Sequence, residues 1–421
     1  MLGWILRRVA HPAVNLATGF LTQAAELNRL QWESSREMEN RILKRLRHVV
    51  AYACGHFRYY RDSLDSASVR PEDIRTFRDF RRIRVITKAD VAKYIEEEGV
   101  LRGRSGRLTS TGATSGRPLT LLTGREASIA GLASKVFFDS WLDVKPHDRK
   151  FSAWSHQASI RDRLFLNELE ATSYGDILKH PKETYNRLSR FKPQLVGGGA
   201  GLRVLASFMI QNDWKVGGRL RSVVAWGMPL LPDQIDILSR AFSEDIYDRY
   251  GSAELSSVVA QQCQARTALH VNTELCHIEI VKDGEPCSDG ERGKVVVTNL
   301  RNLATPFIRY DQEDTAVWVS DCACGRRLPL IAEIRGKDPS CVETKSGVQI
   351  PNSILYSFVG HLKESRYVER FSFRKRSADN LVLTILPRPG FRPQAAENIE
   401  RKLAETLGSL ASVSVEVEWN K

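Results

Sequence analysis

The sequence predicts an α/β fold, with a large N-terminal domain over residues 1–335 and a small α+β C-terminal domain over residues 336–421. Three observations predict it. The chain has 421 residues, which is more than one ordinary hydrophobic core accommodates. From about residue 95 to about residue 320, short apolar runs alternate with amphipathic helical stretches. Beyond Gly336 the pattern changes to strand, strand, helix and strand, which is enough for a small separate domain.

The individual elements follow from hydrophobic spacing. A first long helix is predicted over about 28–62, because apolar residues between Ile42 and Val50 recur at helical intervals. The clearest strands and the helix between them are predicted at 222–227, 294–300 and 231–242. In the C-terminal domain, the strand-like runs YVERFSFRKR, NLVLTILPR and SVSVEVEW accompany a helix predicted over about 393–409.

The net charge of +12 and the pI near 9.4 favour anionic partners such as nucleotides or coenzyme A. The basic residues alternate with apolar ones in RILKRLRH and RRIRVITK, which indicates solvated helix faces and argues against a nucleic-acid surface. No apolar run is long enough for a transmembrane helix. The N-terminal MLGWILRRVAHPAVNLATGFL lacks the pattern of a secretory signal; it is predicted to pack on the protein itself, with a membrane-surface helix as the alternative.

The seven cysteines form an odd set in a long chain in which we see no export signal. A disulfide framework is therefore not expected, and thiols or metal ligands in a reducing cytoplasm are. Cys263 and His270, followed by Cys322 and Cys324, supply three thiolates and one imidazole, a set that suits a closed tetrahedral zinc site. Nearby cysteine and histidine residues could compete as ligands, and buried thiols with an incidental histidine are the alternative. The competitors are Cys276, His277 and Cys287.

The stretch TSTGATSGRPLT, residues 109–120, is rich in hydroxyl groups and glycine. Backbone N–H groups at small residues, together with hydroxyl groups, can wrap an anionic triphosphate, and Arg117 adds a positive charge. The stretch is not a Walker loop, because no Gly-Lys-Ser/Thr follows a first glycine at the required distance. Taken alone, the stretch is more typical of a polar loop.

Two acidic motifs complete a possible nucleotide site. In DRYGSAEL, Glu254 is an oxygen donor of the kind that holds Mg²⁺ beside substrate phosphates, although a surface turn is the alternative. In TPFIRYDQEDTAVW, Asp314 follows a strand-like segment that contains Arg309 and Tyr310. A carboxylate there suits the two hydroxyl groups of a ribose, although a helix cap or a salt bridge would also explain it.

Together, and in this order, the three stretches resemble the adenylate-forming superfamily, and within it the phenylacetate–coenzyme A ligases and the related capsule-biosynthesis and coenzyme-F390-synthetase-like proteins. Residues 111–118 match the phosphate loop, 250–254 match Tyr-Gly-Ser-Thr-Glu, and 309–314 match Arg-Tyr-x-x-Gly-Asp. The flanking ITKADV, FKPQLVGGG and IRGKDPSCVETKSG also look like the family, so the resemblance covers nearly the whole chain.

The resemblance implies a multi-layer N-terminal adenylation domain, a mobile C-terminal domain and ATP-dependent activation of a carboxylic acid. The resulting acyl-adenylate would pass to coenzyme A or to an amine. Glu254 would hold Mg²⁺, and Arg117 and Lys337 would supply positive charge. The nucleotide would be bound by Thr111, Gly112, Thr114, Ser115, Gly116, Tyr250, Gly251, Ser252, Arg309 and Asp314. The cysteine and histidine set would be structural zinc, because some relatives carry a similar set.

The acyl pocket is expected at the ends of strands near the nucleotide. Trp226, Gly227 and Met228 are the candidates to line it, with Trp154 and His156 as further possibilities, although a core tryptophan or a loop histidine would explain any one of them.

Several positions depart from the family pattern. Ala113 and Glu313 stand where glycines are usual, Met228 replaces a glutamate after Gly227, and Lys337 replaces an arginine. The family's catalytic lysine follows the last strand, where this sequence ends. Two alternatives therefore stay open: a degenerate nucleotide-binding subunit, and a membrane-associated partner in envelope or capsule assembly.

Overall fold

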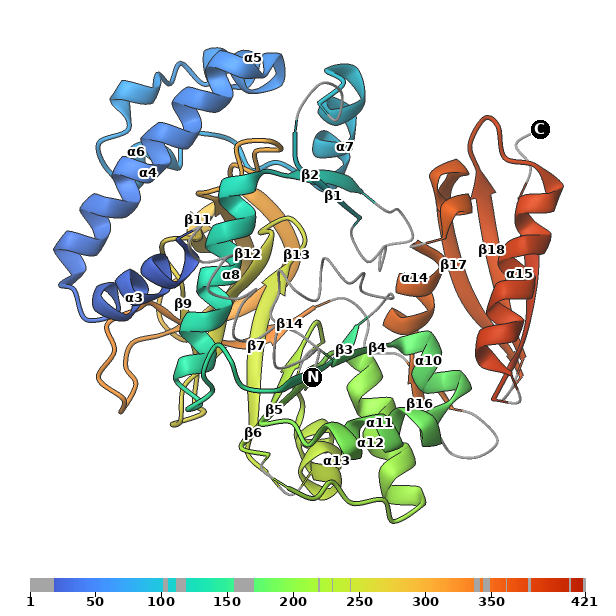
Figure 1. Cartoon of the computed structure of the whole chain (residues 1–421). Coiled ribbons are helices and arrows are strands. Elements are labelled where there is room, and N and C mark those ends of the chain that lie inside the picture. The colour runs from blue at the N-terminus through green and yellow to red at the C-terminus, as the bar shows by residue number, and fades with distance from the viewer. Residues whose placement is uncertain are drawn as a thin grey trace.

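A computed structural model describes most of the chain (Figure 1). The described residues are 19–100, 105–110, 119–154, 170–218, 220–228, 230–242, 244–336, 341–343, 349–360, 362–377, 380–408 and 410–418. The N-terminal segment considered for membrane contact lies largely outside them.

The N-terminal part is helical, but the single helix predicted over about 28–62 is wrong. Three helices cover this region: α3 (Phe20–Leu30), α4 (Ser35–His56) and α5 (Arg58–Ser66). The Ser34 hydroxyl accepts from the Glu37 backbone N–H, and the Glu37 carboxylate accepts from the Ser34 N–H, so a capping box starts α4. Phe57 interrupts the helix with extended backbone, φ −131° and ψ 120°. Its ring is buried against Tyr60 and Tyr94, and this packing outweighs local helix propensity.

Short elements lead from these helices to the main sheet. They are a 3₁₀ turn η2 (Pro71–Asp73), α6 (Phe77–Phe80), α7 (Lys88–Glu97), the antiparallel pair β1 (Arg107–Ser110) and β2 (Thr120–Thr123), and α8 (Arg125–Ser140). Helix α8 is buried along almost its entire length, as a helix enclosed by other layers must be.

A twelve-stranded sheet forms the centre of the molecule, in the order β11-β10-β12-β13-β14-β9-β8-β7-β6-β5-β3-β4. Strands β4, β3, β5, β6 and β7 pair in parallel, and the others pair antiparallel. The bounds are β3 (Lys150–Trp154), β4 (Glu170–Ser173), β5 (Leu195–Gly198), β6 (Ser222–Trp226), β7 (Ile246–Ser252), β8 (Ser257–Gln262), β9 (Leu269–Val271), β10 (Cys276–Lys282), β11 (Glu285–Pro286), β12 (Arg292–Asn299), β13 (Tyr310–Val319) and β14 (Leu330–Arg335).

Helices cover both faces of the parallel part. On one face α8 reaches residues of β3 and β7, through Lys150 and Arg249. The alternate residues of the same strands pack on the other face against α12 and α13. The helices of this region are α10 (Tyr174–Lys179), α11 (Pro181–Phe191), α12 (Ala200–Gln211) and α13 (Pro232–Phe242). The predicted α/β fold is confirmed, including the strands at 222–227 and 294–300 and the helix at 231–242.

The C-terminal part has its own three-stranded sheet, in which β18 pairs antiparallel with β17 and parallel with β19. Its elements are β15 (Cys341–Glu343), β16 (Gln349–Pro351), α14 (Asn352–Gly360), η3 (Lys363–Tyr367), β17 (Val368–Ser377), β18 (Asn380–Pro387), α15 (Pro393–Leu407) and β19 (Ser412–Val417). The expected order of strand, strand, helix and strand is confirmed. The part lies at one side of the molecule (Figure 1), and its apolar core continues into α10 and α12.

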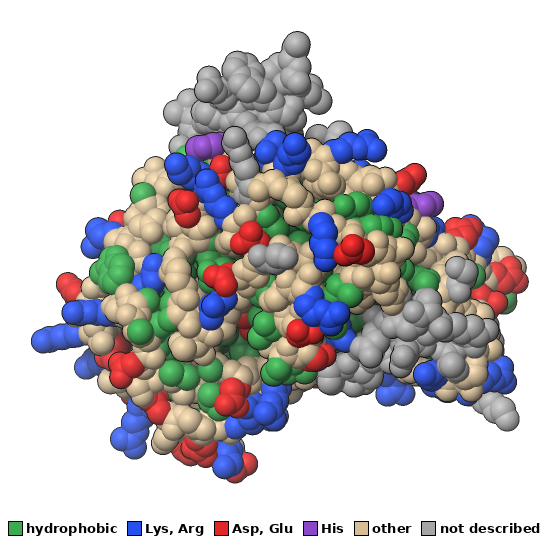
Figure 2. All heavy atoms as spheres, turned by 90° about the horizontal axis from the view of Figure 1, so that it is seen from below, with side chains coloured by type: hydrophobic (Ala, Val, Ile, Leu, Met, Phe, Trp, Pro, Cys, Tyr) green, Lys and Arg blue, Asp and Glu red, His purple; other side chains and the backbone are tan. Residues whose placement is uncertain are grey.

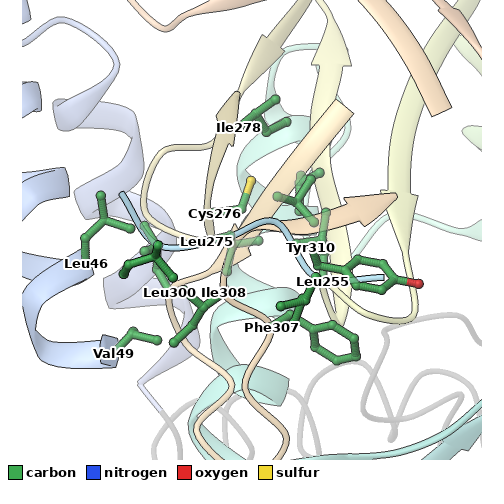
Figure 3. Packing of buried hydrophobic residues seen from close by; sticks show 14 of the residues in the cluster. Leu46, Val49, Leu255, Leu275, Cys276, Ile278, Leu300, Phe307, Ile308 and Tyr310 are labelled. Carbon is green, nitrogen blue, oxygen red and sulfur yellow. The ribbon is translucent and has the colours of Figure 1, made fainter. Parts of the chain in front are cut away.

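A second large core lies where α4 packs on the antiparallel strands. Figure 3 shows Leu46 and Val49 of α4 facing Cys276 of β10 and Ile308 of the loop before β13. Tyr310 belongs to this cluster and is 1% exposed, although it stands in the predicted ribose motif. The start of β13 is therefore anchored in the core.

Charged residues of both signs are interspersed on the face seen in Figure 2, without one basic patch. This distribution agrees with the expectation that the excess positive charge is spread over solvated surfaces. In the part of the chain that the structure describes, no helix is both long and apolar enough to cross a membrane.

Candidate active site

Tyr250 and Asp314 meet at the centre of the candidate site. The Tyr250 hydroxyl donates a hydrogen bond to Asp314 Oδ2 at 2.7 Å. Tyr250 lies near the end of β7 and Asp314 in β13, and three strands stand between β7 and β13 in the sheet order. The sheet therefore curves so that two of the three predicted motifs come together.

Glu254 follows β7 and faces the same part of β13. Its side chain is 7% exposed, and Gln312 Nε2 lies 3.5 Å from Glu254 Oε2. The Ser252 hydroxyl lies 3.4 Å from Gln312 Oε1 and accepts from the Leu255 N–H, which stabilises the turn. Asn299 holds this turn by donating to the Glu254 carbonyl at 3.0 Å.

The carboxyl groups of this site are crowded, which shifts their pKa values. Burial raises the pKa of Asp314 to about 6, and the nearby charges of Glu254 and Asp311 add to the increase. Burial, with the negative charges of Asp314 and Glu254, raises the pKa of Tyr250 well above its usual value, so its hydroxyl stays a donor. A cation would relieve this repulsion, and carboxylates beside a phosphate are ligands that Mg²⁺ prefers.

Gly251 is required by close packing between β7 and β8. A Cβ at this position would lie 2.5 Å from the Ser257 carbonyl oxygen and 2.9 Å from Val258 Cα. Both neighbours are backbone atoms and cannot move aside cheaply. This glycine therefore lets the β7–β8 hairpin close next to Tyr250.

The candidate acyl residues lie at the end of β6, the strand that pairs with β7. Trp226 is in register with Arg249 of β7, the residue before Tyr250. Gly227 has φ +69°, with open space where a Cβ would be. Met228 packs against the apolar cluster under α12 and α13. Trp154 ends β3, and His156 lies outside the described residues.

The phosphate loop, from Thr111 to Pro118, lies outside the described residues, as does Lys337. Strand β2, which follows the loop, is anchored to the segment before β13: the Leu122 N–H donates to the Thr305 hydroxyl, and the N–H of Gly124, directly after β2, donates to Asn302 Oδ1, each at 3.1 Å. Arg117 and the five predicted loop ligands are therefore not placed. These ligands are Thr111, Gly112, Thr114, Ser115 and Gly116.

A cluster of three thiols and one imidazole lies at the end of β8 and in the neighbouring strand β9 and the loop before β14. The ligand atoms of its four residues lie within 4.8 Å of one another, and the residues are Cys263, His270, Cys322 and Cys324. Within the cluster, Cys263 Sγ lies 3.5 Å from Cys322 Sγ, and Cys324 Sγ lies 3.3 Å from His270 Nε2. In a tetrahedral zinc site, the bond lengths give sulfur–sulfur and sulfur–nitrogen separations of about 3.8 and 3.6 Å. The donor set and its spacing therefore fit zinc.

The other possible ligands are engaged elsewhere. Cys276 is buried in the core beneath α4, and Cys287 packs at Gly293. The His277 ring stacks on Phe77, with 4.8 Å between ring centroids. Among the described residues, the only such cluster is the one the sequence analysis favours.

The chain is similar to known acid–coenzyme A ligases in both sequence and structure. No model of a known protein family matches the chain. The chain is 22% identical over 328 residues to the phenylacetate-coenzyme A ligase of Escherichia coli (strain K12), which covers 69% of each chain. A crystal structure of 2-hydroxyisobutyryl-CoA ligase, in complex with 2-HIB-AMP and CoA in the thioesterification state, covers 92% of this chain and 87% of that one, at 20% identity and a TM-score of 0.65. The same ligase in the postadenylation state aligns with a TM-score of 0.60 at 19% identity.

The chain has the adenylate-forming ligase fold and resembles the phenylacetate–coenzyme A ligases. The predicted resemblance is therefore confirmed. Glu313, at the position where the resemblance leads us to expect a glycine, has φ +62°, which is in the left-handed region that favours glycine. Gly336, the last residue of the described segment before the predicted hinge, approaches Asp314 so closely that a Cβ would lie 3.0 Å from Oδ1.

Arg309 does not take the place in this ligase fold that the sequence analysis expects. It is 3% exposed, and its guanidinium pairs with Glu279 at 3.0 and 3.1 Å. It also donates to the carbonyl oxygens of Arg81 at 2.6 Å and Ile83 at 2.5 Å. Since these partners occupy the guanidinium, the geometry supports a role in attaching residues 81–83 to β13 and gives no support to nucleotide binding.

Two residues near the centre had no role in the sequence analysis. Asp248 lies two positions before Tyr250 in β7, so both side chains leave the same face of the strand. Burial raises the pKa of Asp248 to about 7. Gln312 links Ser252 to Glu254. The spacing of Asp248 two residues before Tyr250 could have indicated that Asp248 lies near the site. The role of Gln312 depends on the approach of β13 to β7, which the local sequence does not reveal.

Proposed function

We propose that this chain is an AMP-forming acid–coenzyme A ligase. In the first step a carboxylate oxygen attacks the α-phosphorus of ATP, an acyl-adenylate forms and pyrophosphate leaves. In the second step the thiol of coenzyme A attacks the acyl carbon, AMP leaves, and the thiol proton passes to solvent. The observation that carries the proposal is the convergence of Tyr250, Glu254 and Asp314, from two distant motifs, in a fold shared with such ligases.

The chemical problem in the first step is the approach of an anion to a polyanionic nucleotide. We assign Mg²⁺ to Glu254, because its carboxylate is buried beside further acidic groups that a cation would relieve. We assign the ribose hydroxyl groups to Asp314, which Tyr250 orients through their hydrogen bond. The phosphate loop with Arg117, and Lys337 after the hinge, would supply donors and positive charge at the phosphates.

We further propose that Cys263, His270, Cys322 and Cys324 hold a structural zinc ion. Four protein ligands leave no open coordination position, so zinc here would activate no water and would take no part in the reaction. It would hold the end of β8, strand β9 and the loop before β14 together. Since β8 pairs with β7, this arrangement supports the strand that carries Tyr250.

Residues 336–421 are proposed as a mobile domain that turns about 336–340 between the two steps. The separate sheet β17-β18-β19 supports the division, and the contact of Gly336 with Asp314 would connect the hinge to the nucleotide. Limited proteolysis tests the proposal: ATP with an acid substrate should change the cleavage rate near 336–348. A cleavage pattern unaffected by any substrate would contradict it.

The test of the function is AMP release from ATP with a panel of aryl, fatty, hydroxy and amino acids, in the presence of coenzyme A. Glu254→Gln removes the charge for Mg²⁺ and should lower the turnover rate by at least about a hundredfold. The exposed Glu285→Gln, on β11, is the matched control and should leave it unchanged. If no acid releases AMP although ATP binds, the chain is the degenerate nucleotide-binding subunit instead.

A further inference from the structure

We infer that Asn302 and Asn299 are positioning residues for the proposed nucleotide site, because together they tie strand β2 to the turn that carries Glu254. This inference rests on the proposed acid-activating function. It assigns a role outside the three sequence motifs, since both asparagines lie between the motif of Glu254 and that of Asp314.

Strand β2 is not part of the main sheet. Among the described strands, β1 and β2 form a two-stranded sheet of their own. Leu121 of β2 is buried in the core where α4 packs on the antiparallel strands. Apolar packing is non-directional, so it fixes how deeply β2 lies but not its position along its own axis. The predicted phosphate loop, residues 111–118, leads into β2, so a shift of the strand would move the end of that loop.

The Asn302 side chain supplies the directional contacts of β2. Its Nδ2 donates to the Leu122 carbonyl at 3.0 Å, and its Oδ1 accepts from the Gly124 N–H at 3.1 Å. The Thr305 hydroxyl accepts from the Leu122 N–H at 3.1 Å. Asn302 and Thr305 are at most 1% exposed, so the loss of either partner would leave a buried backbone group unsatisfied. The loop that follows β12 therefore sets the register of β2.

Asn299 carries the connection on to the turn of Glu254. Its Oδ1 accepts from the Asn302 N–H at 2.8 Å and from the Arg301 N–H at 2.9 Å. Its Nδ2 donates to the Glu254 carbonyl at 3.0 Å. Asn299 ends β12 and is 1% exposed. The path from β2 to Glu254 thus runs through two buried amides, and each uses both its donor and its acceptor, which a carboxylate could not do.

The far end of the loop is fixed as well. The hydroxyl groups of Tyr60 and Tyr94 both donate to the Pro306 carbonyl, at 2.8 and 2.9 Å. Both rings are at most 1% exposed. The Asn299 N–H donates to the Phe307 carbonyl at 2.9 Å and closes the loop. Since the loop is held at both ends, the two asparagines set the spacing between β2 and Glu254.

This spacing matters for the proposed first step. Mg²⁺ on Glu254 and the donors of the phosphate loop must meet the same triphosphate, and a displacement of about 1 Å between such groups can cost about a hundredfold in rate. Asn302 and Asn299 act through β2 and Glu254 and are not themselves catalytic residues.

The experiment is a double-mutant cycle that measures the dissociation constant of ATP in the presence of Mg²⁺ by calorimetry. Asn302→Ala should weaken binding about tenfold in the wild-type background and less than about threefold in the Glu254→Gln background, where there is no Mg²⁺ contact to align. Equal losses in both backgrounds would overturn the inference, because a purely structural asparagine affects both alike. If the wild-type protein bound no ATP, the proposed function would fall, and this inference with it.

Asn272→Ala is the matched control. Asn272 is a buried asparagine, 2% exposed, whose side chain donates to the Ser134 hydroxyl and accepts from the Glu274 N–H. Its loss should lower the unfolding temperature as the loss of Asn302 does, yet change ATP affinity by less than about twofold. A loss of affinity as large as that of Asn302→Ala would contradict a specific role for Asn302.

Two variants of Thr305 decide the matter even if Asn302→Ala fails to fold. Thr305→Val has nearly the same shape but no hydroxyl, so the Leu122 N–H loses its acceptor and ATP affinity should fall about fivefold. Thr305→Ser keeps the hydroxyl and should bind ATP as the wild-type protein does. Equal affinities for the two variants would show that the hydrogen bonds to β2 do not position the nucleotide site.

Discussion

Tyr250 donates its hydroxyl hydrogen to Asp314 across a sheet in which β8, β9 and β14 stand between their two strands. This contact joins the motif that carries Glu254 to the motif proposed to hold ribose. It also keeps a buried carboxyl group in one orientation. Five predictions rest on this contact and on the surrounding packing.

Tyr250→Phe should weaken ATP binding about tenfold, because a hydrogen bond to a charged group contributes about 1.5–3 kcal/mol. Without the phenol, the Asp314 carboxylate loses its orienting donor. Isothermal titration calorimetry measures the change. Tyr185→Phe is the matched control, since its hydroxyl donates only to the Lys215 carbonyl at the surface. Equal affinities for the two variants would mean that Tyr250 does not serve the nucleotide.

ATP affinity should fall as the pH drops from 8 to 5, with a midpoint near the Asp314 pKa of about 6. The ionised carboxylate accepts hydrogen bonds from both ribose hydroxyl groups, whereas the protonated group has lost one acceptor site. In Asp314→Asn this part of the pH dependence should disappear. A profile identical in the variant would exclude Asp314 as its source.

The raised pKa of Asp314 also makes the free energy of unfolding depend on pH. Because the folded-state pKa lies above the usual value of 3.8, the native state binds the proton more tightly than the unfolded state. The favourable contribution of Asp314 is therefore complete below about pH 3.8 and is lost as the pH rises through about 6. Asp314→Asn should raise the free energy of unfolding at pH 8 relative to wild type and gain little at pH 4; chemical denaturation at the two pH values measures it.

The protein should contain one zinc ion per chain, measured by elemental analysis after dialysis. Cys322→Ser and Cys324→Ser should lose the ion and lower the unfolding temperature by several degrees, because the metal stabilises only the folded state. Cys54→Ser, outside the cluster, is the control and should retain the ion. A zinc-free wild-type protein with an unchanged unfolding temperature would contradict the assignment.

Arg249→Met should lower the free energy of unfolding by about 3–5 kcal/mol, since the buried Asp139 carboxylate would lose one of its charged hydrogen-bond partners. Arg240→Met is the control. Its pair with Asp236 on the surface of α13, at 3.4 Å, should contribute less than about 0.5 kcal/mol. Denaturant unfolding compares the two, and similar losses would show that the buried network is not a main source of stability.

The order of helices and strands was largely predictable, because hydrophobic periodicity is a local property of the chain. The strand at Ser222–Trp226 and the helix at Pro393–Leu407 lie within about two residues of their predicted bounds. The long N-terminal helix was wrong at Phe57, where burial of an aromatic ring against Tyr60 and Tyr94 overrides a helical pattern. No local signal distinguishes such a residue from its helical neighbours.

The candidate site was also predictable only in part from the sequence. The sequence alone determined the chemistry: which carboxylates, hydroxyl groups, thiols and imidazole were present, and in which order. Only the tertiary structure decided that Tyr250 contacts Asp314, that the four zinc candidates converge while Cys276 and Cys287 do not, and that Arg309 pairs with Glu279. The physical reason is that residue type and spacing act over a few positions, whereas these contacts join segments dozens of residues apart through the curvature of one sheet.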